Sequence, residues 1–438
     1  MAKRVAIIGA GVAGLTSIKS AIDAGLDPTA YERYSWLGGI WNYTEDEERF
    51  AVSKATILNI SKHYSCLSDF PIPKEMPNYM PAHLFQRYLE SCAKEFDLTR
   101  RIRFNCDVLK VEKCKDYEDT GRWEIHSVKR AKNDDRAKED VCVEVYDYVM
   151  VCSGILTKPF IPDIPGIDDF TGRKIHSKSY KTFTKFEGRR VLVVGLGNTA
   201  GDIACELSRH AKQVYVSTRR GTYVVPRMAS GGRPRDISFF TRAVQSIPKS
   251  ILQWLMLRSL NSTYDWANFG LEASDKKSLE FFLVNDELPH RIVTGTLTIK
   301  DEIVHFKDKK VFFKDDTELD DIDDIIFATG YDIEFPFLSK SIFNSETASF
   351  GHQLYKAAFP ADLSKPTLAF IGVFRVGGAV MPVCEMQARW AMQVFKGEFT
   401  LPSKEFMKKD IVARNTNAMM NKNHHASSAS YVVSCTLE

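Results

Sequence analysis

Two short β-branched runs that each lead through a glycine-rich turn into a helical pattern, and a third apolar run downstream, predict an α/β fold of two Rossmann-like units. The first two runs are RVAII at residues 4–8 and RVLVV at 190–194. The third, at 323–332, ends its apolar part in Ala328-Thr329-Gly330. Strands that alternate with helices at this spacing are typical of parallel sheets covered by helices on both faces.

The first unit begins with the strand at 4–8, the GxGxxG turn Gly9-Ala10-Gly11-Val12-Ala13-Gly14 and a helical pattern. Gly9 permits the tight bend, Gly11 lets the backbone approach a pyrophosphate, and Gly14 lets the helix pack against the strand. The next strand, PTAYE, ends in Glu32, 23 residues after Gly9. A carboxylate at that offset binds ribose hydroxyls and repels a 2′-phosphate, so this dinucleotide site favours FAD or NAD.

The stretch after Glu32, RYSWLGGIWNY, contains Gly38, Gly39 and Trp41. Two consecutive glycines behind a ribose-binding acid indicate a loop that passes close to a bulky cofactor. An ordinary turn would have a similar composition, and the sequence leaves that alternative open.

The second unit begins with the strand at 190–194 and the turn Gly195-Leu196-Gly197-Asn198-Thr199-Ala200, followed by a helix over 201–210. Its next strand, QVYVSTRR, places Ser217, Thr218 and Arg219 where the first unit has its acid, because Arg219 lies 24 residues after Gly195. A hydroxyl and a guanidinium at this position suit the 2′-phosphate of NADPH. The alternative for Arg219 and Arg220 is a solvated pair at a strand end.

Two dinucleotide units of opposite charge preference in one chain imply that NADPH delivers hydride to a flavin. An apolar strand ending in Ala-Thr-Gly recurs where such flavoproteins return from the NADPH domain to the FAD domain. We therefore expect the NADPH domain to be inserted into the FAD domain, with connecting straps at 158–165 and 331–338. The expected boundaries are 1–158 and 331–410 for the FAD domain, 159–330 for the NADPH domain with a helical insertion around 222–295, and 411–438 for a C-terminal tail.

Between the two units lies the pattern Phe170-x-Gly172-x-x-x-His176-x-x-x-Tyr180-Lys181. With this pattern the sequence resembles the flavin-containing monooxygenases, whose fingerprint FxGxxxHxxx(Y/F) precedes the second glycine turn. Baeyer-Villiger monooxygenases end that fingerprint in Trp followed by Pro or Asp, which this chain lacks. The resemblance covers nearly the whole chain and points to the animal branch through LGGIWNY, SDFPIP, VLVVGLGNTAGD, VNDELPHRIVTG, FATGY and PVCEMQARW. We expect His176 and Tyr180 to hold the domain junction rather than to perform chemistry.

Asn59 is the catalytic residue that the resemblance implies. Animal members place an asparagine about ten residues before the SDFP motif, against the flavin ring, and Asn59 occupies that position here. Its amide can donate and accept, so it is expected to hold the flavin edge and the nicotinamide of NADP+, whereas by sequence alone it suits a loop or cap. The full expected cofactor set is Gly9, Gly11, Val12, Ala13, Gly14, Glu32, Arg33, Gly39, Ile40, Trp41, Leu58, Asn59, Ile60, Val108, Gly195, Gly197, Asn198, Thr199, Ala200, Thr218, Arg219, Thr329 and Gly330.

The activity implied by the resemblance is an NADPH- and O2-dependent monooxygenation. NADPH reduces FAD, dioxygen adds to flavin carbon 4a, and the hydroperoxide transfers oxygen to a tertiary amine nitrogen or a sulfide sulfur without a general base. Soluble, shortened relatives include insect N-oxygenases that detoxify alkaloids, which is the favoured subclass. Two alternatives stay open: an NADPH oxidase or reductase that releases peroxide, and a flavin-binding redox sensor without enzymatic activity.

Composition excludes several other classes. The 438 residues carry a formal net charge of +3, which argues against a nucleic-acid binder. Nine scattered cysteines without a CxxC pair argue against a disulfide framework, a zinc ribbon and a dithiol centre. No metal site is expected, and no run reaches the ~18 apolar residues of a transmembrane helix. We therefore expect a soluble cytoplasmic protein, a homo-oligomer, whose partners are a small nucleophilic substrate and O2.

Residues 222–295 are the least informative region. They combine a Gly/Pro/Arg loop with an amphipathic helical pair broken at Pro248. Trp254, Leu255, Met256 and Leu257 form an apolar cluster, for which core or subunit interface is favoured over a membrane-facing surface. The chain ends in a polar segment that includes His424 and His425 and has weak structure signals, whereas membrane-bound animal members of the family continue into a hydrophobic anchor. Two alternatives stay open: a naturally soluble member or a truncated sequence.

Overall fold

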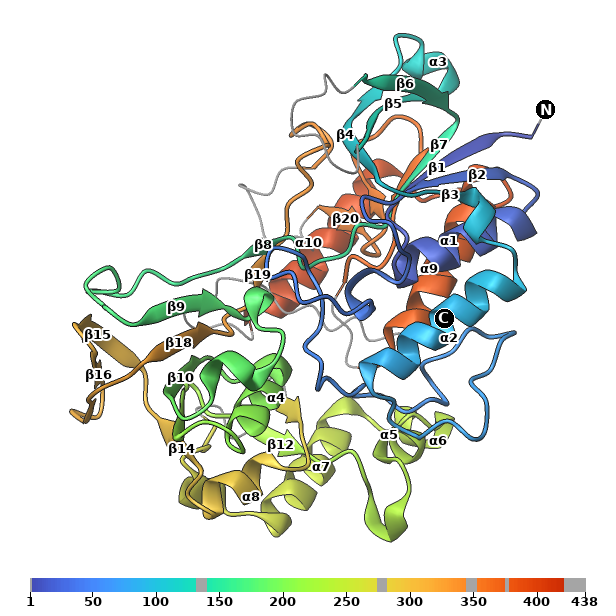
Figure 1. Ribbon diagram of the computed structural model, residues 1–438. Coiled ribbons are helices and arrows are strands. Elements are labelled where there is room, and N and C mark those ends of the chain that lie inside the picture. The colour runs from blue at the N-terminus through green and yellow to red at the C-terminus, as the bar shows by residue number, and fades with distance from the viewer. Residues whose placement is uncertain (1, 131–139, 274–281, 344–352, 375–377, 421–438) are drawn as a thin grey trace.

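A computed structural model describes residues 2–130, 140–273, 282–343, 353–374 and 378–420. Its two lobes each contain a five-stranded parallel sheet (Figure 1). The first sheet has the order β22-β7-β1-β2-β3, formed by β1 (Arg4–Ile8), β2 (Asp27–Tyr31), β3 (Ile102–Arg103), β7 (Tyr148–Val151) and β22 (Leu368–Phe370). The second has the order β14-β11-β10-β18-β9, formed by β9 (Arg173–His176), β10 (Arg190–Val194), β11 (Gln213–Ser217), β14 (Leu297–Lys300) and β18 (Asp324–Phe327).

The helices cover these sheets and fill the lower part of the second lobe (Figure 1). Their bounds are α1 (Val12–Asp23), α2 (Ala82–Glu95), α3 (Tyr117–Thr120), α4 (Asn198–Leu207), α5 (Arg235–Phe239), α6 (Arg242–Gln245), α7 (Lys249–Thr263), α8 (Leu288–Val293), α9 (Val380–Phe395) and α10 (Lys404–Met420). In the first lobe α1 packs against α9, and a Cβ on the nearby Gly372 would lie 2.9 Å from the Cβ of Ala13 on α1 and 3.0 Å from the Sγ of Cys384 on α9. The apolar strands are buried on both faces, as in other parallel sheets between helices.

Both lobes also contain smaller sheets of two or three strands. An antiparallel sheet joins β4 (Cys106–Lys113), β5 (Trp123–Lys129) and β6 (Cys142–Tyr146). Another joins β15 (Ile303–Lys307), β16 (Lys310–Phe313) and β17 (Glu318–Leu319). Two-stranded pairs are β12 (Tyr223–Val225) with β13 (Phe282–Val284), and β20 (Leu354–Tyr355) with β21 (Phe359–Pro360).

The second domain is inserted into the first. β7 and β22 are neighbours in the first sheet, yet all strands of the second sheet lie between them in sequence. The two passages of the chain between the lobes lie side by side, because β8 (Lys158–Pro159) pairs antiparallel with β19 (Tyr331–Asp332). Thr157 donates a 2.8 Å hydrogen bond to the carbonyl of Asp332, which also joins the two passages. The predicted nesting of the two units is confirmed.

His176 lies at this passage as a neutral imidazole. Its Nε2 lies 3.0 Å from the carbonyl of Gly330, and its Nδ1 accepts a 3.1 Å bond from the backbone N–H of Lys178, so the proton resides on Nε2. Burial lowers the pKa of His176 to about 4, which keeps the ring uncharged. The ring also lies edge-on to Tyr331, at 4.9 Å between centroids.

Tyr180 differs from the expectation, because it lies in the core of the second domain rather than at the junction. Its hydroxyl donates a 2.8 Å bond to the buried carboxylate of Glu206 on α4. The neighbouring Lys181 makes the inter-lobe contact instead: its Nζ donates to the carbonyl of Arg49 at 2.7 Å, and its own carbonyl accepts from Lys54 at 2.9 Å. Burial lowers the pKa of the Lys181 ammonium to about 8.

Two further segments differ from their sequence-based description. Pro248 precedes α7 and separates it from α6, as predicted, but Trp254 and Leu255 on α7 are 57% and 43% exposed and are therefore not core residues. Leu257 does pack against the core of the second domain. At the other end, α10 continues to Met420, so helical structure extends into the segment expected to be a tail. His424 and His425 lie outside the described residues.

Both glycine turns are shaped by a close approach of backbone to backbone. Gly9 has φ +105°, and a Cβ there would lie 2.8 Å from the carbonyl oxygen of Cys152 at the end of β7. Gly195 has φ +103°, and its Cβ would lie 2.7 Å from the carbonyl oxygen of Ala328 at the end of β18. A Cβ on Gly14 would meet the carbonyl oxygen of Gly9 at 2.0 Å, so α1 can lie on its turn only with hydrogen at this position.

We therefore predict that Gly14→Ala destabilises the protein by about 3 kcal/mol, the upper range for forcing atoms into a packed site. Gly197→Ala is the matched control, because a Cβ there has no atom within 4 Å, and it should cost less than about 1 kcal/mol, the penalty of alanine at a helix cap. Urea unfolding followed by circular dichroism measures both. Equal midpoints for the two variants would contradict the steric argument.

Candidate functional site

The first turn presents the N-terminal N–H groups of α1. Gly11 is the N-cap of this helix and supplies no side-chain cap, so the N–H groups of Val12, Ala13 and Gly14 have no partner within the helix. A Cβ on Gly11 would have its nearest neighbour, the Cα of Gly39, at 3.6 Å, which leaves ordinary space over the turn. This arrangement suits a pyrophosphate.

The loop that contains Gly39, Ile40 and Trp41 lies next to this turn. The N–H of Gly38 donates a 2.9 Å bond to the carbonyl of Ala10, which anchors the loop to the turn. Residues 39–41 form a short 3-10 helix, and the Trp41 ring lies edge-on to Phe85 of α2, at 4.8 Å between centroids. The structure therefore brings the loop and the glycine turn together.

Glu32 follows β2 and is buried at the edge of the same turn. Its Oε2 accepts a 2.8 Å bond from the N–H of Ala10, and its Oε1 accepts a 3.0 Å bond from the N–H of Tyr34. Burial raises the pKa of the carboxyl group, and these two N–H bonds oppose that rise. Each carboxylate oxygen retains a second acceptor position, which ribose hydroxyls require.

Arg33 and Val108 lie near Glu32, Arg33 as the next residue in the chain and Val108 on β4. The Arg33 Nε lies 3.6 Å from the Asp107 carboxylate, the residue before Val108 on β4. Val108 is half-buried and packs against the apolar cluster that contains Tyr31. The N–H of Cys106 bonds to the carbonyl of Glu32 at 2.9 Å, so β4 starts beside the acid.

The second turn has the same construction at the start of α4. Gly197 is the N-cap without a side-chain cap, so the N–H groups of Asn198, Thr199 and Ala200 have no partner within the helix. No atom lies within 4 Å of a Cβ built on Gly197, and Ala200 is buried against the sheet. The side chain of Asn198 is engaged, because its Oδ1 accepts a 2.8 Å bond from the N–H of Val284.

The charge at the end of β11 is opposite to that at the end of β2. Arg219 is exposed there and Thr218 is half-buried. Ser217 does not contribute, since its hydroxyl is buried and donates a 2.8 Å bond to the carbonyl of Asp301. Of the predicted residues Ser217, Thr218 and Arg219, the last two have side chains that could contact a 2′-phosphate.

Thr329 and Gly330 contact the passage between the lobes. The Thr329 hydroxyl donates to the carbonyl of Phe160, and the carbonyl of Gly330 accepts from the N–H of Phe160 at 3.0 Å. The preceding Ala328 adjoins the second turn. These two residues therefore connect the NADPH-type turn to the junction.

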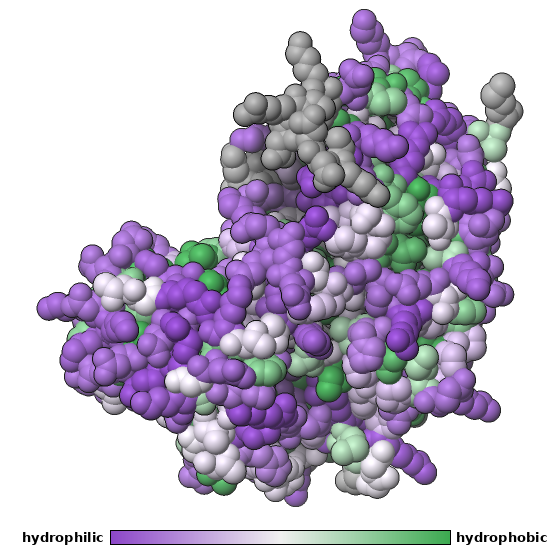
Figure 2. Space-filling view, viewed as in Figure 1, coloured by the Kyte–Doolittle hydropathy of each residue, from purple (hydrophilic) through white to green (hydrophobic). Residues whose placement is uncertain are grey.

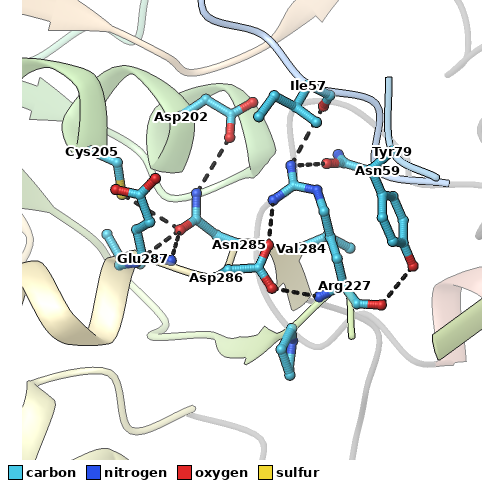
Figure 3. Close-up of polar contacts among 12 residues, drawn as sticks. Ile57, Asn59, Tyr79, Asp202, Cys205, Arg227, Val284, Asn285, Asp286 and Glu287 are labelled. Carbon is cyan, nitrogen blue, oxygen red and sulfur yellow. Dashed lines mark hydrogen bonds and ion pairs between the residues drawn. The ribbon is translucent and has the colours of Figure 1, made fainter. Parts of the chain in front are cut away.

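Asn59 lies on a segment that both lobes hold. Leu58 is buried in the first core and its N–H bonds to the carbonyl of Met80 at 2.9 Å, whereas Ile60 is half-buried. The Asn59 Oδ1 accepts a 2.9 Å bond from the guanidinium of Arg227, a residue of the second lobe (Figure 3). Asn59 is thus placed at the inter-lobe contact, with its carboxamide oxygen facing the second domain.

Sequence reasoning missed two groups of residues around these sites. Arg227, Asp236 and Asp286 come from the uninterpreted insertion, and no local pattern relates them to Asn59, which is 168 residues away from Arg227. Cys152-Ser153-Gly154 follows β7 as Ala328-Thr329-Gly330 follows β18, and Gly154 has φ +81° where Gly330 has φ +91°. That repeat, an apolar strand followed by small residues and glycine, was a signal available in the sequence.

These features fit the cofactors predicted for them. Open space lies over Gly197, Gly11 leaves ordinary space over its turn, and a helix N-terminus faces each turn. At the predicted ribose positions, the buried carboxylate of Glu32 follows β2 and Arg219 follows β11. Among the described residues no group of His, Cys, Asp and Glu is arranged to hold a metal ion. None of the helices in the described part of the chain has the length and apolar character needed to span a membrane. The face in Figure 2 is mostly hydrophilic, with hydrophobic residues in small separate patches.

Known structures share this architecture. An S-allyl-L-cysteine S-oxygenase from Allium sativum superposes with a TM-score of 0.70 at 24% identity, covering 96% of this chain and 83% of that one. The open form of cyclohexanone monooxygenase superposes with a TM-score of 0.65 at 17% identity, covering 96% and 93%. At these identities the likeness establishes the fold.

Sequence relatives are much more similar. Flavin-containing monooxygenase 1 of Homo sapiens is 43% identical over 425 residues, which are 95% of this chain and 78% of the relative. Dimethylaniline monooxygenase [N-oxide-forming] 2 of Cavia porcellus is 42% identical over 423 residues, 95% of this chain and 77% of the relative. A profile described as flavin-binding monooxygenase-like matches residues 2–435. The chain therefore belongs to the flavin-binding monooxygenase-like family, whose enzymes use FAD and NADPH.

Proposed function

We propose that this enzyme uses NADPH and O2 to oxygenate soft nucleophiles, tertiary amine nitrogens or sulfide sulfurs, and that alkaloids or other xenobiotics are among its substrates. The observation that carries the proposal is the pair of nested nucleotide turns with opposite charges at their ribose ends, Glu32 and Arg219. This pair suits FAD in the first domain and NADPH in the second. The N-oxide-forming activity in the name of the relative from Cavia porcellus supports the substrate class.

The residues divide into two binding groups. In the first domain the N–H groups at the start of α1 bind the FAD pyrophosphate, Glu32 binds ribose hydroxyls, and residues 39–41 cover the cofactor. In the second domain the start of α4 binds the NADPH pyrophosphate, and Thr218 and Arg219 bind the 2′-phosphate. When bound, FAD accepts hydride from NADPH and activates dioxygen.

The rest of the mechanism requires exclusion of water more than acid-base catalysis. Asn59 contributes hydrogen bonds between the cofactors, and Leu58 and Ile60 contribute backbone contacts. The neutral His176 contacts the passage between the lobes, and the buried Lys181 joins the two lobes. Attack by an uncharged amine or a sulfide needs no protein base, so nucleophilicity and access select the substrate.

The setting proposed for this activity is the cytoplasm. The eight described cysteines are all free thiols, which suits a reducing compartment. We also propose a homo-oligomer, because the exposed apolar side chains of α7, Ile251, Trp254 and Leu255, suit an interface between copies of this chain.

The FAD-loaded protein should convert a tertiary amine to its N-oxide or a sulfide to its sulfoxide in proportion to the NADPH and O2 consumed. Mass spectrometry of a panel of amines, sulfides and alkaloids, with an oxygen electrode, measures this. Peroxide equal to NADPH with every compound would indicate an oxidase. A bound flavin that NADPH does not reduce without oxygen would indicate a sensor, and failure to take up FAD would exclude both the proposal and these alternatives.

Arg219→Ala should lower the ratio of kcat/KM for NADPH to that for NADH by about tenfold or more, since a hydrogen bond to a charged group contributes about 1.5–3 kcal/mol. Lys212→Ala is the matched control, because Lys212 is an exposed cation at the opposite end of the same strand. An unchanged coenzyme ratio in Arg219→Ala would refute the assignment.

Asn59→Ala should retain FAD and lose oxygenated product, with NADPH consumption diverted to peroxide. The physical reason is that Asn59 is proposed to hold the cofactors in register while Glu32 and α1 bind FAD independently. Flavin absorbance and the product-to-NADPH ratio measure the two effects. Asn261→Ala, at an exposed position of α7, should behave as the wild type, and normal product yield from Asn59→Ala would count against its role.

A further inference from the structure

Two nitrogens of the Arg227 guanidinium contact the Asn59 segment, residues 57–61, and the third nitrogen pairs with Asp286. Arg227 is 9% exposed and follows β12 in the insertion. Its Nη2 donates to the Asn59 Oδ1 at 2.9 Å and lies 3.5 Å from the carbonyl of Ile57, and its Nε donates to the carbonyl of Leu58 at 3.2 Å. Its Nη1 pairs with the Asp286 carboxylate at 2.9 Å (Figure 3).

These contacts determine which end of the Asn59 carboxamide faces Arg227. A carboxamide has one accepting oxygen and one donating NH2 group, whereas a guanidinium has donors only. If the amide were reversed, two sets of N–H groups would face each other beside a positive charge. The oxygen therefore turns toward Arg227, and the NH2 group turns away from it.

We propose that Arg227 is a positioning residue that fixes this orientation, so that Asn59 meets the cofactors only as a hydrogen-bond donor. Asn59 then recognises an acceptor atom of the bound flavin or nicotinamide and cannot exchange roles during turnover. The identity of those cofactors rests on the function proposed above. The orientation itself rests on the contacts of Arg227.

Arg227 is in turn fixed by its own surroundings. Asp286 accepts from the Arg227 backbone N–H at 2.8 Å as well as from its side chain, so main chain and guanidinium are held together. The hydroxyl of Tyr79 donates to the Arg227 carbonyl at 2.6 Å. Because both the backbone and the guanidinium of Arg227 are already hydrogen-bonded, Arg227 loses little further conformational entropy when it orients Asn59.

The same network reaches the second glycine turn. The side chain of Asn198, the first residue of α4, holds the N–H of Val284, and Asp286 lies two residues further along. The Nδ2 of Asn285 donates to Asp202 of α4 at 3.3 Å. The turn proposed for NADPH is thus connected to Asn59 through α4, residues 284–286 and Arg227.

A second contact from the insertion holds the other end of the Asn59 segment. The buried carboxylate of Asp236 accepts from the N–H of Ser61 at 2.6 Å, and its other oxygen lies 3.4 Å from the Tyr79 hydroxyl. Arg227 and Asp236 therefore hold residues 57–61 by hydrogen bonds at two places. Removal of Arg227 alone leaves the segment attached while it frees the carboxamide to rotate.

The test compares Arg227→Met, Arg227→Lys and Asn59→Asp in the FAD-loaded protein, with Arg209→Met as matched control. Arg209 pairs with Glu287, the neighbour of Asp286, without contacting Asn59. Asn59→Asp keeps an acceptor for Arg227 and removes both donors. Three readouts are measured: NADP+ affinity from the change in flavin absorbance, hydrogen exchange of residues 57–61, and the product-to-NADPH ratio.

Arg227→Met should weaken NADP+ binding about tenfold, speed hydrogen exchange in residues 57–61 and lower the product-to-NADPH ratio, with Arg227→Lys between it and the wild type. Asn59→Asp should keep the slow exchange yet lose NADP+ affinity and product to the same degree. Arg209→Met should change none of the three.

Wild-type NADP+ affinity and product yield in Arg227→Met would overturn the positioning role, and wild-type values in Asn59→Asp would overturn the donor role. If Arg227→Met does not fold, the folded Asn59→Asp protein still decides the donor role and Arg227→Lys decides the positioning role. If the wild type itself yields only peroxide, the proposed function fails, whereas the NADP+ affinities still decide the inference.

Discussion

Both domains depend on the close approach of a glycine to the carbonyl of the first residue after the neighbouring strand. Gly9 lies against Cys152 and Gly195 against Ala328, each with a positive φ that leaves no room for a side chain. This contact sets where the following helix begins and points its free N–H groups toward the end of the sheet. The placement of each acid or arginine at the next strand end then follows, because the strands are parallel and end at the same edge.

The functional centre that we propose lies between the domains. The second domain inserts between β7 and β22 of the first, and its own insertion extends back to residues 57–61 through Arg227 and Asp236. Asn59 is therefore held by side chains that belong to the NADPH-type domain. His176 contacts Gly330 and Tyr331 at the passage, and the buried Lys181 donates to the carbonyl of Arg49 in the other lobe. Ion pairs of Lys178 with Glu48 and of Lys185 with Glu47 also join the lobes.

Local charge, not net charge, separates the two nucleotide sites. The formal net charge of the whole chain is +3, and this value does not predict the sign of the charge at either turn. Glu32 is buried and its carboxylate is oriented by two backbone N–H groups, whereas Arg219 is exposed at the end of β11. A buried, oriented acceptor suits hydroxyls, and an exposed guanidinium suits a phosphate whose remaining oxygens stay solvated.

The two nested Rossmann-like units were predictable from sequence patterns, since β1 and β10 begin and end where the patterns RVAII and RVLVV predict. Those features are local: an apolar run, a glycine turn and a helix each follow from residues that are adjacent in the chain. The contacts of Arg227 and Asp236 with the Asn59 segment, the core position of Tyr180 and the exposure of Trp254 became clear from the fold. The first two join segments 168 and 175 residues apart, Tyr180 bonds to Glu206 on another element 26 residues away, and Trp254 depends on which face of a helix is covered. None of these has a periodic signature in the sequence.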